Sequence, residues 1–294
     1  MNMITREEMV KMAVETRKNV TSAIVTPEEL DEYPVEMEQL HIPTRVGDST
    51  VYYSYREDEP GMPLIINLHG GGFIRARTES DDLFCRKLAY RLNCKVLDVD
   101  YRVAPEHPFP TALHECYDVV KWVYDNAVKL QADSSKIVLM GHSAGGNMVT
   151  GISMLGKQSG DFKAACVVMD YPPMDLFTDP DQKETRGNGI PAERARLYNL
   201  YYCEREQQQD YLVSPIFATV EQLRDFPNAL VITAEDDSLC TEGEQFALRL
   251  AQAGGEVTLK RFPGTGHGFT IYRMNGHEDA LDLIVRFVKS NLDI

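Results

Sequence analysis

Residues 136–147, KIVLMGHSAGGN, decide the fold that we expect for this chain. A short run of apolar residues ends at Gly141, and small residues lead from Ser143 into a segment of helical character. This order predicts a buried strand, a sharp turn that exposes Ser143, and a helix. The glycines fit such a turn, because a Cβ at Gly141 or Gly145 would clash with the adjacent strand or helix. The alternative is an ordinary strand–helix turn in which Ser143 only caps the helix.

Strands and helices alternate on both sides of this stretch. Continuous apolar runs predict strands buried on both faces: PLIINL (63–68), KVLDVD (95–100), KIVLM (136–140) and ALVITA (229–234). A hairpin is expected around Gly47, and a helix is expected from an N-cap at Ser80 to Leu92. The pattern predicts an α/β fold, with a mostly parallel central sheet and helices on both faces.

Residues 174–213 break this alternation. They are polar at first and then helical from Pro191, which we expect at the first helical position, and they contain no strand pattern. We interpret them as an insertion over the C-terminal edge of the sheet, where active-site lids are commonly built. The insertion carries tyrosines that either shape a pocket or pack inside the cap, namely Tyr198, Tyr201 and Tyr202.

Composition argues against several classes of partner. The 294 residues include 45 acidic and 30 basic side chains, a formal net charge of -15, which repels nucleic acid and anionic membrane surfaces. The N-terminus lacks the apolar segment of a signal peptide, and no apolar run is long enough to span a membrane. The six cysteines show no CxxC pairing. We therefore expect a cytoplasmic protein with reduced, mostly buried thiols.

The stretch LHGGGF, residues 68–73, follows a predicted strand and exposes backbone N–H groups without side-chain obstruction. Preorganised donors of this kind stabilise an oxyanion. The expected donors are the N–H groups of Gly71, Gly72 and Ala144, the residue after the serine. A phosphate-binding loop is disfavoured, because the Gly-Lys-Ser/Thr ending and the dinucleotide spacing are both missing. His69 is expected to fix the loop through hydrogen bonds.

The base that activates Ser143 must bring its ring within hydrogen-bond reach and have a carboxylate behind it. His142 is adjacent, but a neighbour across a sharp turn points its side chain away. In sites of this strand–turn–helix type, the acid and then the histidine follow the serine along the chain. His267 lies in the glycine-rich loop PGTGHGF, residues 263–269, and is the expected base. His277 lies at the start of the last predicted helix, where a capping role fits better.

The acid is expected at the end of a strand before the base. Glu235, Asp236 and Asp237 follow ALVITA, and Asp170 follows another predicted strand as a weaker alternative. Three consecutive acids cannot all face His267, and the spacing alone does not separate them.

Several motifs occur together in a characteristic order: HGGGF (69–73), DYRVAPEHPFP (100–110), GHSAGGN (141–147), AEDDSL (234–239) and GHGF (266–269). Over residues 64–288 the chain resembles the hormone-sensitive-lipase-like family of α/β-hydrolases, in its bacterial carboxylesterase and acetyl-esterase branch. The resemblance implies the α/β-hydrolase fold, with a helical cap over the sheet.

The resemblance also selects the acid. The family's acid is the aspartate of an Ala-Glu-x-Asp-x-Leu pattern, which residues 234–239 match with Asp237. Two positions depart from the family: His142 stands where an aspartate often precedes the serine, and Ser238 stands where proline is usual.

The family plan implies a division of the chain into a catalytic domain of residues 36–173 and 214–294 and a cap of residues 1–35 and 174–213. In the DYRVAPE stretch, Arg102 and Glu106 resemble a structural ion pair that braces the oxyanion loop.

The function implied is hydrolysis of short-chain or acetyl esters by a serine carboxylesterase. Ser143, His267 and Asp237 would form the catalytic triad, and Phe73 is a candidate substrate contact. The chemistry requires no metal and no cofactor. The expected partner is a small-molecule ester, and a homodimer is a possible assembly.

Other functions on the same fold stay open. A small-molecule receptor that has lost the catalytic histidine is one, although His267 is present here. A serine peptidase or amidase is another, but the sequence shows no proton donor placed for an amine leaving group. A true lipase would need a long apolar lid, and no such segment is found.

Overall fold

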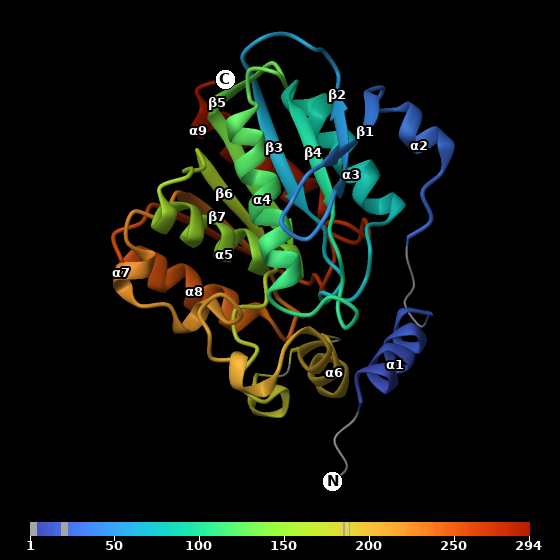
Figure 1. Cartoon of the computed structure of the whole chain (residues 1–294), viewed down its shortest axis with the longest axis vertical. Coiled ribbons are helices and arrows are strands. Elements are labelled where there is room, and N and C mark those ends of the chain that lie inside the picture. The colour runs from blue at the N-terminus through green and yellow to red at the C-terminus, as the bar shows by residue number, and fades with distance from the viewer. Residues whose placement is uncertain (1–4, 19–22, 185, 188) are drawn as a thin grey trace.

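A computed structural model describes residues 5–18, 23–184, 186–187 and 189–294. An eight-stranded sheet forms its centre, with the order β1-β2-β4-β3-β5-β6-β7-β8 (Figure 1). The hairpin of β1 (Glu36–Ile42) and β2 (Ser49–Tyr55) pairs antiparallel with the rest. The parallel strands are β3 (Met62–Leu68), β4 (Lys95–Asp100), β5 (Ala132–His142), β6 (Cys166–Asp170), β7 (Asn228–Ala234) and β8 (Val257–Phe262). The predicted α/β fold with a mostly parallel sheet is confirmed.

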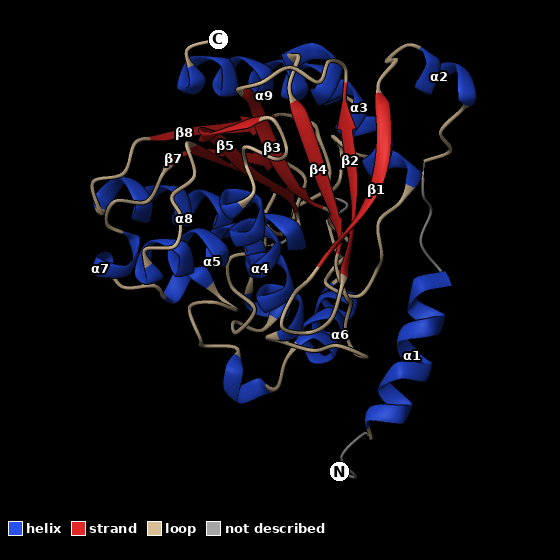
Figure 2. Ribbon diagram, turned by 45° about the horizontal axis from the view of Figure 1, so that its top comes forward, coloured by secondary structure: helices blue, strands red, loops and turns tan. Residues whose placement is uncertain are grey.

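Helices cover both faces of the sheet (Figure 2). One face carries α3 (Glu79–Leu92) and α9 (His277–Leu292), and the other carries α4 (Thr111–Asp125), α5 (Ala144–Ser159) and α8 (Cys240–Gln252). Every residue of β3 is buried, as the continuous apolar run predicted. All six cysteines are buried and unbridged. None of the helices in the described ranges is long and apolar enough to cross a membrane.

The insertion after β6 contains no strand among its described residues, as expected. Its main helix, α6 (Ala192–Tyr202), lies beyond the C-terminal ends of the parallel strands (Figure 1). A short helical turn, η1 (Pro180–Gln182), precedes α6. Three more follow it in the chain: η2 (Arg205–Gln207), η3 (Pro215–Phe217) and α7 (Val220–Leu223). Pro191 is the N-cap residue of α6 and not its first helical residue.

The two N-terminal helices lie at different ends of the molecule (Figure 1). The first, α1 (Arg6–Lys18), is tied to the loop after β3 by Arg17, whose Nε donates to the carbonyl oxygen of Ile74 at 2.6 Å. The second, α2 (Pro27–Asp31), packs near α3. Only α1 therefore approaches the end of the sheet at which α6 lies.

Two further local expectations were wrong. Arg102 does not pair with Glu106: its Nη1 lies 2.7 Å from Oε1 of Glu115, while Glu106 binds Arg17 at 2.6 Å. Helix α4 turns Glu115 back toward Arg102, and α1 supplies a guanidinium to Glu106 from far along the chain. The N-cap of α3 is Thr78 and not Ser80, because Thr78 forms a capping box with Asp81.

The turn between β5 and α5 is as tight as the glycine pattern predicted. Ser143 has φ 50° and ψ -118°, a conformation that L-residues rarely adopt. A Cβ at Gly145 would lie 1.9 Å from the carbonyl oxygen of Leu68, at the end of β3. A Cβ at Gly141 would lie 2.3 Å from the carbonyl carbon of Gly145. The backbone of the turn therefore packs directly on the neighbouring strand.

Gly145→Ala tests this packing. The added methyl group meets backbone atoms that cannot rotate away, so we expect the free energy of unfolding to fall by about 1–3 kcal/mol and the melting temperature by several degrees. Gly151→Ala, in the same helix, is the control, because its Cβ would meet the flexible side chain of Leu113 at 3.2 Å. Equal melting temperatures for Gly145→Ala and the wild type would contradict the account.

Candidate active site

The loops that follow four of the parallel strands carry the groups expected at the site. Ser143 follows β5, and the glycine loop follows β3. Asp237 follows β7, and His267 follows β8. Because the carboxyl ends of parallel strands meet at one edge of a sheet, residues far apart in sequence come together there.

Ser143, His267 and Asp237 lie within hydrogen-bond distance of one another in series. Nε2 of His267 is 3.0 Å from Oγ of Ser143, and Nδ1 is 2.7 Å from Oδ2 of Asp237. Asp237 is fully buried, whereas the side chain of His267 is 20% exposed. The carboxylate is thus withdrawn from water, and the imidazole faces the site.

The other candidate acids have other partners. Glu235 accepts a hydrogen bond from the backbone N–H of Gly264 at 2.9 Å. Asp236 borders the pocket described below. Oδ1 of Asp237 also accepts from the backbone N–H of Leu239 at 3.1 Å, which fixes the carboxylate on its loop.

Among the described residues, the other two candidate bases, His142 and His277, form hydrogen bonds with groups other than Ser143. His142 points into the core, where its Nδ1 lies 3.0 Å from Oδ2 of Asp170 and its ring meets the edge of Phe84. His277 begins α9 and bonds the carbonyl oxygen of Met274 at 2.8 Å. The expectation that His142 points away from Ser143 is confirmed. Asp170, which was a candidate partner for His267, is the partner of His142 instead.

Sequence reasoning missed two residues, Thr270 and Tyr171, that connect the His142–Asp170 pair to His267. The hydroxyl of Thr270 donates to the same oxygen of Asp170, and the hydroxyl of Tyr171 lies 2.8 Å from that of Thr270. The ring of Tyr171 then packs edge-on against His267, with the centroids 5.0 Å apart. Burial raises the pKa of Tyr171 well above its usual value, so the phenol stays protonated. The only signal in the sequence is the position of Thr270, three residues after His267.

The glycine loop is built for close approach of a ligand to its backbone. Gly71 and Gly72 have φ values of 123° and 60°, which favour glycine. Within the described ranges, no residue accepts a hydrogen bond from the N–H of Gly71, Gly72 or Ala144. His69 holds the loop: its Nδ1 is 2.7 Å from the carbonyl oxygen of Gly70, and its ring stacks on Tyr101. The structural role expected for His69 is confirmed.

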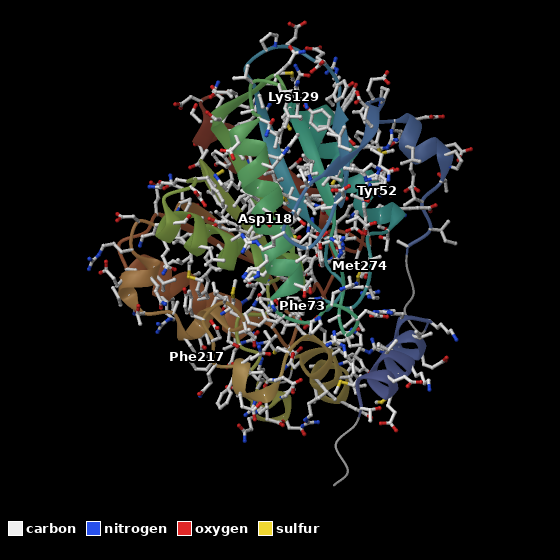
Figure 3. The ribbon with its side chains drawn as sticks, in the orientation of Figure 1. Tyr52, Phe73, Asp118, Lys129, Phe217 and Met274 are labelled. Carbon is white, nitrogen blue, oxygen red and sulfur yellow. The ribbon has the colours of Figure 1, made fainter. Side chains whose placement is uncertain are left out.

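A pocket of about 600 Å³ opens onto Ser143 and His267. The glycine loop forms one wall, and α6 contributes Tyr198. Phe73 borders the pocket, but its ring is only 3% exposed and stacks on Tyr202 at 3.7 Å, close to α6 (Figure 3). Tyr201 and Tyr202 are buried at the end of α6. Of the three tyrosines, Tyr198 therefore shapes the pocket, and the other two pack.

The chain is similar to known ester hydrolases over most of its length. Residues 65–271 match the family model described as the alpha/beta hydrolase fold. An arylesterase of Saccharolobus solfataricus is 32% identical over 238 residues, which cover 80% of this chain and 75% of the relative. An ethyl acetate hydrolase of Pseudomonas putida is 31% identical, over 78% of this chain and 74% of the relative.

Solved structures of esterases show the same similarity. A hyperthermophilic esterase from the archaeon Pyrobaculum calidifontis superposes with a TM-score of 0.83 at 31% identity, over 97% of this chain and 92% of the esterase. The thermostable carboxylesterase EstE1, cloned from a metagenomic library, gives 0.81 at 30% identity, over 98% and 96% of the two chains. This chain therefore belongs to the hormone-sensitive-lipase-like carboxylesterase family of α/β-hydrolases.

Proposed function

We propose that this ester hydrolase works through a Ser143–His267–Asp237 triad and an acyl-enzyme intermediate. The observation that carries the proposal is the series of two contacts, 3.0 Å from Ser143 Oγ to His267 Nε2 and 2.7 Å from Nδ1 to Asp237. Esterases among the relatives support the reaction class.

In the first half-reaction, Oγ of Ser143 attacks the ester carbonyl carbon while Nε2 of His267 accepts the hydroxyl proton. The tetrahedral intermediate collapses, the bond to the alcohol oxygen breaks, and His267 returns the proton to the leaving alcohol. Asp237 keeps the Nδ1 proton in place and stabilises the imidazolium that forms. In the second half-reaction, water takes the role of Ser143, and the acid is released.

The developing negative charge on the carbonyl oxygen would be bound by the N–H groups of Gly71, Gly72 and Ala144. Their freedom from protein acceptors within the described residues supports this role. Ala144 begins α5, so the positive end of the helix dipole adds to the stabilisation. Removing one such donor typically costs about 10²–10³ in rate.

We further propose that residues 1–35 and 174–213 supply a cap to the catalytic domain, with α6 lining the pocket and α1 bonded to the loop after β3. The proposed substrates are short-chain or acetyl esters. A pocket of about 600 Å³ and the resemblance to the ethyl acetate hydrolase of P. putida support that choice.

Ser143→Ala and His267→Ala are each expected to lower kcat for 4-nitrophenyl acetate by about 10⁴-fold or more, because the nucleophile or its base is lost. Both variants should keep the wild-type circular dichroism spectrum. A fluorophosphonate should label Ser143 in the wild type, which a non-catalytic receptor would not allow. Retention of wild-type activity by either variant would overturn the triad.

Asp237→Asn and Asp236→Asn separate the two adjacent acids. Without the carboxylate behind it, the imidazole of His267 adopts the wrong tautomer, so we expect kcat to fall by about 10⁴-fold in Asp237→Asn. The ring nitrogens of His267 bond Asp237 and Ser143, so Asp236→Asn should keep most of the activity. A larger loss in Asp236→Asn would contradict the assignment.

Thr270→Val removes the hydroxyl that links Asp170 to the loop of His267 while keeping the side-chain shape. We expect a fall in kcat of about tenfold to 10²-fold with little change in KM, because a small displacement of the base slows the chemical step. Thr258→Val, on an exposed position of β8, is the control. A change in KM with unchanged kcat would show that Thr270 does not position the base.

A further inference from the structure

Two arginines border the pocket without an acid partner. Arg75 and Arg194 both line it, and in the part of the chain that the structure describes neither forms an ion pair with a carboxylate. Arg75 donates from Nη2 to the phenol oxygen of Tyr272 at 3.2 Å, and its Nε is buried without an acceptor among the described residues. Arg194 is exposed at the start of α6.

Neighbouring arginines of the same two segments are paired. Arg77, two residues after Arg75, binds Asp98 and lies 3.1 Å from Asp82. Arg196, two residues after Arg194, lies 2.6 Å from Asp179 and also binds Asp181. The chain carries a net charge of -15, so acids are plentiful. The guanidiniums of Arg75 and Arg194 line the pocket and lack an acid partner among the described residues. They are therefore placed to bind an anion that enters from solvent.

The two arginines approach one region of the pocket from different elements. Arg75 follows the glycine loop, and its backbone N–H donates to the carbonyl oxygen of Gly71 at 3.2 Å. Arg194 lies one helical turn before Tyr198 and so shares its face of α6. Burial raises the pKa of Tyr198, and the positive charges of Arg75 and Arg194 oppose that rise. Both charges therefore act on the same ring.

The pocket also contains two carboxylates. Asp81 is 5% exposed and accepts hydrogen bonds from the N–H of Thr78 at 2.8 Å and its hydroxyl at 2.7 Å, so its charge is satisfied within α3. Asp236 belongs to the loop after β7, beside the proposed acid. The positive charges lie instead on the segment between β3 and α3, which carries Arg75, and on α6, which carries Arg194. The positive and the negative charges of the pocket thus lie on different elements.

We propose that the enzyme prefers esters that carry a carboxylate on the acyl or the alcohol part, and that Arg75 and Arg194 bind this anion. This substrate class deepens the proposed function and rests on it. A guanidinium presents a planar fork of donors that matches a carboxylate, and it keeps its charge at all working pH values. A neutral ester of equal size would leave both guanidiniums without a counter-charge.

The test compares kcat/KM for two matched pairs of esters. Mono-4-nitrophenyl adipate against 4-nitrophenyl hexanoate places the carboxylate on the acyl part, and 4-acetoxybenzoate against 4-acetoxybenzamide places it on the alcohol part. The wild type should prefer the anionic member of at least one pair. In Arg75→Gln and Arg194→Gln the ratio of kcat/KM for the anionic member to kcat/KM for the neutral member should fall about tenfold, because a charge-assisted hydrogen bond is lost.

Arg196→Gln is the matched control, because Arg196 lies on the same helix but binds Asp179 and Asp181. It should leave the preference unchanged. The wild-type preference should also weaken at high salt, which screens a partly exposed charge. Absence of a preference in both pairs, or a preference that survives in Arg75→Gln and Arg194→Gln, would overturn the proposal.

Calorimetric titration with adipate separates this proposal from the proposed function. Adipate should bind the wild type and bind more weakly to Arg75→Gln. If adipate binds in this way but no ester is hydrolysed, the triad is wrong and the anion site stands. If neutral esters are hydrolysed but adipate does not bind and no anionic ester is preferred, the anion site is wrong and the triad stands.

Discussion

The close contact between Gly145 and the end of β3 is the constraint on which the site depends. The carbonyl oxygen of Leu68 lies 1.9 Å from the position that a Cβ of Gly145 would take, so the first turn of α5 rests on the strand that leads into the glycine loop. Ser143 and the N–H groups of Gly71 and Gly72 are therefore held together by backbone packing, which side-chain motion does not loosen. Preorganisation of this kind makes an oxyanion site effective, because its donors need not move during the reaction.

Two histidine–aspartate pairs surround Ser143, and the structure gives them different surroundings. His267 and Asp237 meet at the pocket, with the imidazole facing the serine. His142 and Asp170 are buried in the core behind it. Thr270 bonds the buried aspartate from the loop that carries His267, so the buried pair anchors that loop to the turn. The residue that departs from the family at position 142 thus contributes to the placement of His267.

Much of the fold and of the site was predictable, because the signals are local. Strands such as β3 are continuous apolar runs, and the glycines on either side of Ser143 indicate the sharp turn there. Asp237 needed the family resemblance, since spacing did not separate it from Asp236. The expected Arg102–Glu106 pair was wrong. Arg102 pairs with Glu115 and Glu106 pairs with Arg17, because the packing of the helices, and not proximity in sequence, brings these side chains together. No pattern marked the unpaired arginines of the pocket for the same reason.

Trapping the covalent intermediate tests the central claim most directly. The wild type, mixed with 4-nitrophenyl acetate and quenched in acid within the first turnover, would be digested and examined by mass spectrometry. The account predicts one acetyl group, carried by Ser143, which disappears as the substrate is exhausted and does not accumulate in His267→Ala. Turnover without an acetylated Ser143, or an acetyl group that forms at the same rate without His267, would contradict it.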